Sequence, residues 1–263
     1  MKNKLSILLT AAACLSLPSL ARAQSSVYLG SASTFAVLAG STVTNTGNTI
    51  VYGDIGVSPG ASVSGFPSGV DNNGTIYAGG STAAQAETDA ATAYDFLLGE
   101  ATGSTDLSGQ DLGTLTLTPG VYQFSAAAQL TGTLVLNGEG NPNAQFDFLI
   151  GTTLTTATGS QVNFLDGGQA ANVFWQVGTS ATLGTSTDFS GTILANTSIT
   201  DNGTSTVAGR LLALNGAVTL NDDFVAVPEP ADASLLMAGL SGLVFGFGAI
   251  RRRLGAASGR ADA

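Results

Sequence analysis

Thr197-Ser198-Ile199-Thr200 is one copy of a four-residue pattern that recurs along this 263-residue chain. Every copy has an apolar residue third and a Thr fourth, and all but the looser last copy have a Thr or Ser first. The last four copies end at residues 155, 182, 200 and 219, so they are 27, 18 and 19 residues apart. Recurrence at this spacing indicates coils that stack on one another. The other copies are Ser41-Thr42-Val43-Thr44, Thr152-Thr153-Leu154-Thr155, Thr179-Ser180-Ala181-Thr182 and the looser Gly216-Ala217-Val218-Thr219.

The alternation of side chains along a strand predicts which residues of these copies are exposed. Neighbouring side chains point to opposite faces, so an inward third residue places the second and fourth outside. Stacked coils would then carry small, uncharged hydroxyl groups on one flat side. Such a face suits binding to an extended, ordered surface, although threonine is also simply a good strand residue. The predicted outer residues are Thr42, Thr44, Thr153, Thr155, Thr182, Thr200 and Thr219, above an inner set of Val43, Leu154, Ala181, Ile199 and Val218.

A second self-similarity supports coils of about 18 residues. Phe189 and Val207 are 18 residues apart, as are Ile193 and Leu211, and a small polar run precedes each of Val162, Phe189 and Val207. Three short strands per coil fit this period, which predicts an all-β fold built as a parallel β-solenoid. A β-sandwich also has short, evenly spaced strands and is the competing architecture.

Residues 81–98 have a helical pattern instead. Thr82 and Gln85 match a capping box, and Gly99 is placed to end a helix. We expect one helix here, whose alanine-rich face lies close against a sheet. Its apolar stripe consists of Ala86, Ala90, Ala93, Tyr94 and Leu97.

Composition limits the partners of the chain. It is 44% hydrophobic but only 10% charged, against about 25% in average proteins. Residues 24–227 hold fifteen Asp and Glu and a single basic residue, Arg210, so their net charge is about −14. This charge disfavours nucleic acids and anionic membrane surfaces. We expect Arg210 to pair with Asp188 or Asp201, and Trp175 to lie in the core.

The residue types needed for most enzyme mechanisms are missing. The chain has no histidine, and residues 24–227 have no lysine or cysteine, which removes the common nucleophiles, bases and zinc ligands. Asp222 with Asp223, or Asp106 with Asp111, could form a carboxylate pair, but nothing places either pair in a cleft. No aspartate ladder typical of calcium repeats is present. We expect no enzyme activity, catalytic residue, metal or cofactor.

The N-terminal residues 1–23 have the features of a secretory signal peptide. Lys2 and Lys4 precede an apolar stretch, and cleavage is expected between Ala23 and Gln24. The single cysteine, Cys14, lies inside this segment. A lipoprotein signal ending at Cys14 is the alternative, but the small residue at position 11 disfavours it.

The C-terminal segment 228–254 resembles the PEP-CTERM sorting signal of Gram-negative bacteria. Pro228-Glu229-Pro230 precedes an uncharged stretch at 234–250, and Arg251, Arg252 and Arg253 follow, with residues 255–263 as a short tail. Seventeen residues are at the lower limit of a membrane span, and the arginines should stay cytoplasmic. The resemblance implies transient membrane anchoring, removal of the tail by an exosortase-type protease, and a final location at the cell surface or outside the cell.

Several motifs in residues 27–224 resemble landmarks of the microbial ice-binding protein family. They are Gly53-Asp54-Ile55-Gly56-Val57-Ser58-Pro59, Leu117-Thr118-Pro119-Gly120-Val121-Tyr122, Asn172-Val173-Phe174-Trp175-Gln176-Val177 and Gly209-Arg210-Leu211-Leu212-Ala213. The resemblance implies a right-handed β-solenoid of roughly triangular cross-section with one long helix alongside. The family's face carries Thr-Ala/Gly-x-Thr/Asn elements, and none of the copies here matches fully. The copies ending at Thr182 and Thr200 have Ser in the second place, and the copy ending at Thr219 has Gly in the first.

Two hypotheses of function follow from these observations. In the first, residues 24–227 form an exported ice-binding domain that adsorbs to ice through its threonine face, as an antifreeze or recrystallisation inhibitor. In the second, the same scaffold is a cell-surface or biofilm-matrix adhesin whose partner is surface polysaccharide. In both, signal peptidase and an exosortase-type protease act during export, and the membrane is met only through the C-terminal segment.

Overall fold

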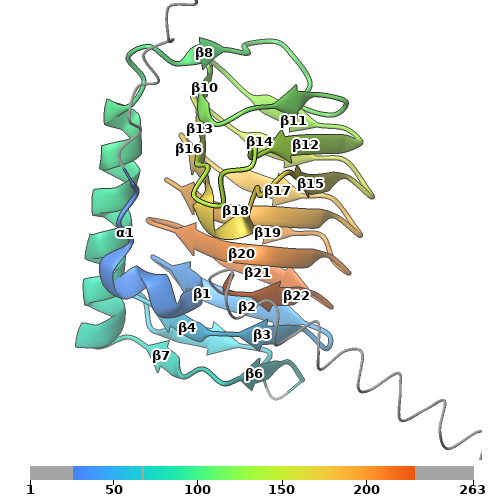
Figure 1. Ribbon diagram of the computed structural model, residues 1–263. Helices are drawn as coiled ribbons and strands as arrows, with labels where there is room; N and C mark the ends of the chain where they lie inside the picture. Colours follow the sequence, from blue (N-terminus) through green and yellow to red (C-terminus); the bar gives the residue numbers. More distant parts are fainter. Residues whose placement is uncertain (1–25, 67, 229–263) are drawn as a thin grey trace, which may run out of the picture.

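The computed structural model describes residues 26–66 and 68–228. Within them the chain is mostly β structure with parallel sheets and one α-helix, α1 (Ser81–Gly99) (Figure 1). Short 3₁₀ helices lie at Gly30–Thr34 (η1) and Ala170–Asn172 (η2). Strand pairing is parallel throughout the described residues, which excludes the antiparallel β-sandwich.

The strands fall into three rows that run along the stack of coils. The hydroxyl row contains β11 (Ala128–Leu130), β14 (Leu154–Thr156), β17 (Ala181–Leu183), β19 (Ile199–Asp201), β21 (Val218–Asn221), β2 (Thr42–Thr46) and β5 (Ser62–Ser64), in that spatial order. The helix row contains β8 (Thr105–Asp106), β10 (Gly120–Phe124), β13 (Phe146–Ile150), β16 (Val173–Val177), the second halves of β18 (Asp188–Ala195) and β20 (Thr206–Ala213), β1 (Phe35–Ala39), β4 (Asp54–Val57) and β7 (Ile76–Ala78). The third row contains β9 (Thr116–Leu117), β12 (Thr133–Asn137), β15 (Gln161–Leu165), the first halves of β18 and β20, β22 (Phe224–Ala226), β3 (Ile50–Tyr52) and β6 (Val70–Asn72).

Glycines allow β18 and β20 to pass from the third row into the helix row. Gly191 has a φ of 112°, a conformation that L side chains rarely adopt. A Cβ on Gly209 would lie 1.8 Å from the carbonyl oxygen of Gly191. The coil of β20 can therefore approach that of β18 closely at this corner only because Gly209 has no side chain, and a Cβ on Gly191 would in turn lie 2.8 Å from Val173 in the preceding coil.

The spatial order of the coils differs from their order in the sequence. The first coil stacks on the last one, with Val37 opposite Leu211 and Thr44 opposite Thr219. Helix α1 then carries the chain along the stack to the opposite end, where β8 begins (Figure 1). Nineteen helical residues span about 28 Å, which is roughly six coils at about 4.8 Å each.

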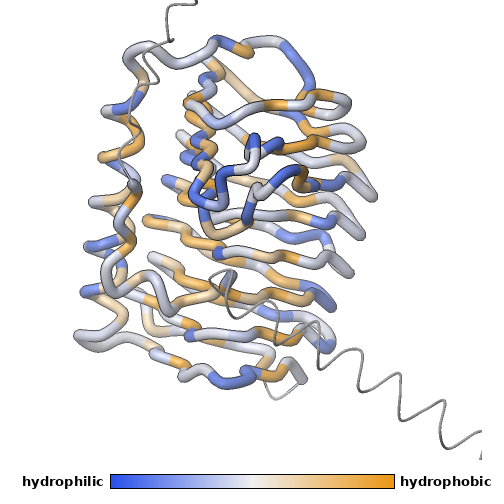
Figure 2. Tube along the Cα trace, viewed as in Figure 1, coloured by the Kyte–Doolittle hydropathy of each residue, from blue (hydrophilic) through white to orange (hydrophobic). Residues whose placement is uncertain are grey.

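The core lies inside the coils and consists of buried apolar side chains. Figure 2 shows hydrophobic residues, in orange, recurring along the strands of successive coils. The rings of Phe148 and Trp175 stack at 3.9 Å, and Trp175 meets Phe189 at 5.1 Å. Trp175 is fully buried, and its indole N–H donates to the carbonyl oxygen of Ser190 at 3.0 Å. The prediction that Trp175 belongs to the core is confirmed.

A second core joins α1 to the helix row. Ala86 and Ala90 are fully buried against this row, where Leu38, Leu194 and Leu212 belong to the same cluster. The predicted helix at 81–98 is confirmed as Ser81–Gly99. The predicted capping box is wrong, because the N-cap is Gly80 and no side chain caps the helix.

Arg210 does not form the predicted ion pair with Asp188 or Asp201. Its guanidinium donates to the carbonyl oxygen of Ser33 at 2.9 and 2.8 Å and to Thr192 Oγ1 at 3.3 Å. The side chain lies under η1, so it ties the N-terminal segment to the last coil. Burial lowers the pKa of Arg210 to about 10.

Several predicted features lie outside the described residues. They include the signal peptide 1–23 with its cleavage site at Ala23 and Gln24, the sorting residues Glu229, Pro230, Arg251, Arg252 and Arg253, and the expected span at 234–250. Pro228 is the last described residue. No helix in the described part of the chain is long and apolar enough to cross a membrane.

The close packing of α1 leads to a stability prediction. Ala90→Leu should lower the free energy of unfolding by about 1–3 kcal/mol, because the extra atoms must displace the helix from the helix row. Chemical denaturation would measure this change. Ala84→Leu is the matched control, since Ala84 is exposed on the same helix. Equal stability of the two variants would contradict the packing described here.

Candidate functional site

The hydroxyl row brings five of the predicted threonines into one continuous column. The parallel register places Thr155 opposite Thr182, Thr182 opposite Thr200, Thr200 opposite Thr219 and Thr219 opposite Thr44. Thr44 therefore adjoins the last copy of the pattern, although 175 residues separate it from Thr219 in the sequence. Gln129 and Ser64 continue the column at its two ends.

Thr42 and Thr153 lie in a second column, two residues before Thr44 and Thr155. Thr42 pairs with Ser62. The register of the row places Ala217, Ser198 and Ser180 between Thr42 and Thr153. The seven predicted residues thus lie on the same face of one row, but in two columns, and the second column is interrupted by small residues without a threonine methyl group.

The burial of the row follows the predicted alternation. Thr44 and Thr155 are exposed, and the other five predicted threonines are partly exposed. The residues predicted to point inward, Val43, Leu154, Ala181, Ile199 and Val218, are at most 1% exposed.

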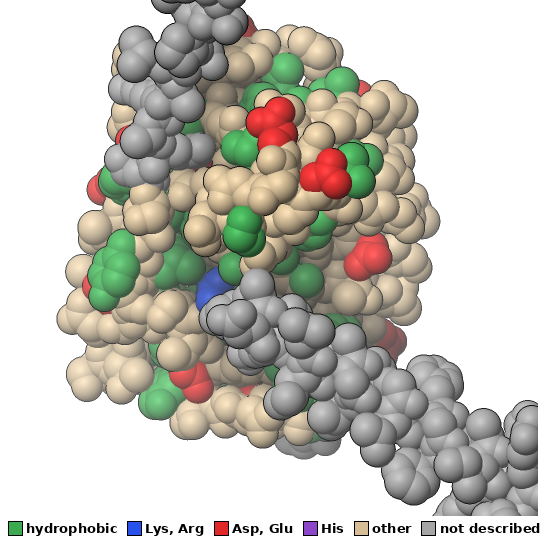
Figure 3. Space-filling model, viewed as in Figure 1, with side chains coloured by type: hydrophobic (Ala, Val, Ile, Leu, Met, Phe, Trp, Pro, Cys, Tyr) green, Lys and Arg blue, Asp and Glu red, His purple; other side chains and the backbone are tan. Residues whose placement is uncertain are grey.

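The outer surface of the row is uncharged and regularly spaced. Asp201 is the single charged residue in its seven strands, and it is 1% exposed. Neighbouring side chains are about 4.8 Å apart across strands and about 6.6 Å apart along a strand. Elsewhere, acidic side chains are scattered among uncharged ones, as Figure 3 shows for the side seen in Figure 1. The row can therefore hold an ordered array of hydroxyl and methyl groups, but it presents no group for acid–base chemistry.

Buried hydroxyl groups fix the corner between the hydroxyl row and the third row. The hydroxyls of Thr156 and Thr187 are 2.9 Å apart, and Ser160 Oγ donates to the carbonyl oxygen of Leu130 at 2.8 Å. Ser205 Oγ donates to Asp201 Oδ1 at 2.7 Å. Ser160, Thr187 and Ser205 belong to the small polar runs of the sequence, which indicated a repeat but not that its hydroxyls point inward.

Two buried carboxyl groups meet at this corner, and sequence reasoning missed them as a pair. Asp201 ends β19 and Asp223 follows β21, and they are 1% and 2% exposed. Burial raises the pKa of Asp201. Burial and the neighbouring Asp201 raise the pKa of Asp223 to about 7. The backbone N–H groups of Asn221 and Ser205 donate to Asp223, which limits this rise.

The carboxyl groups considered as pairs in the sequence lie at strand ends or between strands. Asp222 is exposed whereas Asp223 is buried. Asp106 accepts from the N–H of Ser108, and Asp111 accepts from two backbone N–H groups, as turn residues do. Among residues 26–66 and 68–228 no three His, Cys, Asp or Glu side chains form a group that could hold a metal ion.

Comparison with known proteins identifies relatives of this architecture. A family model described as ice-binding-like matches residues 37–226. An ice-binding protein of Nostoc sp. (strain HG1) is 50% identical over 95% of this chain and 96% of its own length. Ice-binding protein 1 of Shewanella frigidimarina is 36% identical over 75% of this chain, which corresponds to 25% of that longer protein. The crystal structure of an ice-binding protein from Antarctomyces psychrotrophicus matches with a TM-score of 0.74 and 38% identity, over 78% of this chain and all of the other.

The buried carboxyl pair predicts how stability depends on pH. The pKa of Asp223 rises from an ordinary value near 3.8 to about 7 on folding. The contribution of Asp223 to stability is therefore complete when the pH is below the ordinary pKa near 3.8, and it is lost as the pH rises through about 7. Between pH 5 and pH 9 we expect the free energy of unfolding to fall by at least about 1 kcal/mol, given about 1.4 kcal/mol per pKa unit.

The variant Asp201→Asn should reduce the fall in the free energy of unfolding between pH 5 and pH 9, because it removes one of the two charges that repel each other. Urea denaturation at both pH values would measure it. Glu87→Gln is the control for another acid whose pKa is raised by burial, to about 8. The assignment to the pair fails if Asp201→Asn loses as much stability as the parent protein.

Proposed function

The chain belongs to the ice-binding-like family, and on this premise we propose that it is an exported protein that adsorbs to ice through the hydroxyl row. The observation that carries the proposal is the in-register column from Thr155 to Thr44. A column without charge, supported by buried apolar residues, presents methyl and hydroxyl groups at fixed spacing. Water held by such a surface can merge with an ice lattice.

Adsorption of this kind requires shape and rigidity rather than reactive groups. The backbone hydrogen bonds between coils and the buried hydroxyls at the corner stabilise the stack that carries the threonines. The proposed ice-contacting residues are Thr42, Thr44, Thr153, Thr155, Thr182, Thr200 and Thr219. We further infer a right-handed winding of the coils, because connections between parallel strands have this hand in almost all proteins.

Export and surface sorting belong to the same proposal. The resemblance of residues 228–254 to a sorting signal supports release at the cell surface after transient anchoring. The same resemblance also fits an adhesin built on this scaffold, which is the second candidate function. Activity on ice separates the two, because an adhesin does not need a face that orders water.

Bulky substitutions in the column test the proposed face. Thr200→Tyr and Thr44→Tyr should each strongly reduce the inhibition of ice recrystallisation, since one large ring prevents the flat surface from meeting ice. Exposed substitutions usually change stability by less than about 0.5 kcal/mol, so thermal melting should be almost unchanged. Thr206→Tyr is the control, because Thr206 is an exposed threonine on the third row.

Three outcomes would count against this proposal. Full activity in both column variants places the binding face elsewhere. Loss of activity in Thr206→Tyr alone identifies the third row as the binding face. An inactive parent protein favours the adhesin.

The proposed processing has its own prediction. In a host with the matching sorting protease, the mature protein should begin at Gln24 and end near Pro230, because both signals would be cleaved. N-terminal sequencing and intact mass would measure this. A secreted form that still contains Arg251 to Arg253 contradicts the assignment of the tail.

A further inference from the structure

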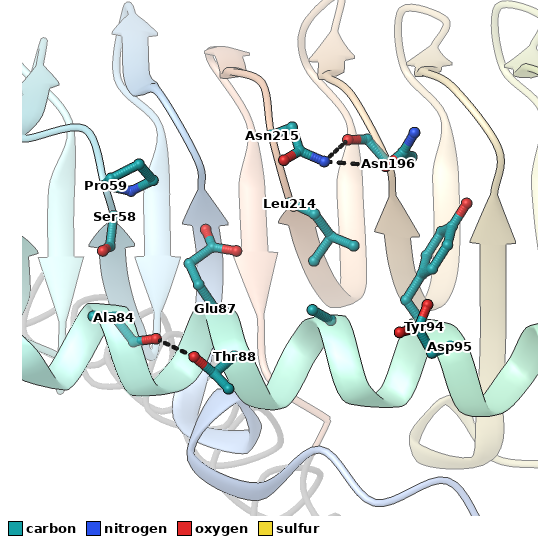
Figure 4. A pocket seen from close by; sticks show the side chains of 11 residues that line it. Ser58, Pro59, Ala84, Glu87, Thr88, Tyr94, Asp95, Asn196, Leu214 and Asn215 are labelled. Atoms are coloured by element: carbon teal, nitrogen blue, oxygen red, sulfur yellow. Dashed lines mark hydrogen bonds between the residues drawn. The ribbon is translucent and has the colours of Figure 1, made fainter.

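A cavity of about 460 Å³ lies between α1 and the turns that lead from the helix row into the hydroxyl row (Figure 4). This volume is within the range of about 300–1,000 Å³ typical of small-molecule sites. Helix α1 contributes Glu87, Tyr94 and Asp95. The opposite side is formed by the turns after β4, β18 and β20, which contribute Ser58, Pro59, Asn196, Leu214 and Asn215.

Glu87 projects from α1 into this space (Figure 4), and its Oε1 atom is buried without a hydrogen-bond partner. A buried carboxylate without a partner is costly, so the group retains its proton instead. Burial accordingly raises the pKa of Glu87 to about 8. The cavity therefore contains a carboxyl group whose buried Oε1 atom has neither a hydrogen-bond donor nor a positive charge beside it.

The other groups around the cavity supply no positive charge. Asp95 and Tyr94 are the other ionisable groups that line it, and the turns facing them contribute hydroxyl, amide and apolar groups. Arg210, the single basic residue of the described chain, is bound to Ser33 and Thr192. Asn196 and Asn215 are joined by a hydrogen bond of 3.0 Å and present polar groups at the rim (Figure 4).

We propose that this cavity binds a small organic cation of the alkylammonium class. Its ammonium group would contact the Glu87 carboxylate, and its hydrocarbon part would lie against Leu214, Pro59 and Ala91. A calcium ion fits less well, because it takes six to eight oxygen ligands and the cavity offers two carboxyl groups eight residues apart on one helix. The site is separate from the threonine column and goes beyond the proposed adsorption to ice.

Binding can be tested with butylammonium chloride as the probe. Calorimetry at pH 9 should show saturable binding to the purified protein, with at least tenfold weaker affinity at pH 6. The reason for this sign is that Glu87 is ionised above its pKa of about 8 and neutral at pH 6, whereas the ammonium group stays charged at both values. Butanol is the uncharged apolar probe and glucose is the uncharged polyol probe. Neither should bind with an affinity comparable to that of butylammonium.

Variants separate a specific site from a general effect of negative charge. Glu87→Gln keeps the shape of the side chain and should abolish butylammonium binding at pH 9. Glu139→Gln removes the same charge from an exposed turn and should bind like the parent. Both variants should keep full activity on ice, so a failure here leaves the proposed function untouched. The proposal is overturned if butylammonium does not bind, if Glu87→Gln binds it equally, or if butanol or glucose binds as well.

Discussion

The hydrogen bonds between the first and the last coil are the interaction on which the rest of the structure depends. The N–H groups of Gly40, Ser41 and Ile50 donate to carbonyl oxygens of Ala213, Gly216 and Asp223, at 2.8 to 2.9 Å. They join two segments from opposite ends of the domain into one stack. Without them the threonine column would stop at Thr219, and both segments would expose an unpaired strand edge.

Much of the architecture could be predicted from local patterns in the sequence. The recurrence at 18 and 19 residues predicted parallel coils, and the alternation around Ile199 and Val218 predicted which side chains lie inside. The helix at 81–98 followed from its alanine stripe. These features depend on neighbours within one coil or one helical turn, so the sequence contains the information directly.

The remaining features depend on contacts between distant segments. Nothing in the spacing of the copies indicates that Thr44 adjoins Thr219, because the step through α1 breaks the repeat. Arg210 has acidic residues nearby in sequence but contacts a carbonyl oxygen of η1. Asp201 and Asp223 form a pair only once two coils are stacked. Each of these features is fixed by tertiary packing, where period and propensity give no signal.

The stacking of the first coil on the last coil has a consequence for the order in which the domain can form. Because the chain is synthesised from its N-terminus, the coil at 35–52 exists long before the strands at 206–226 on which it stacks. The contact between the earliest and the latest segments can therefore form only once the latest segment is present, and long-range contacts of this kind are slow to form. A chain that crosses a membrane unfolded meets this requirement naturally, since all of its segments reach the far side before the stack is completed.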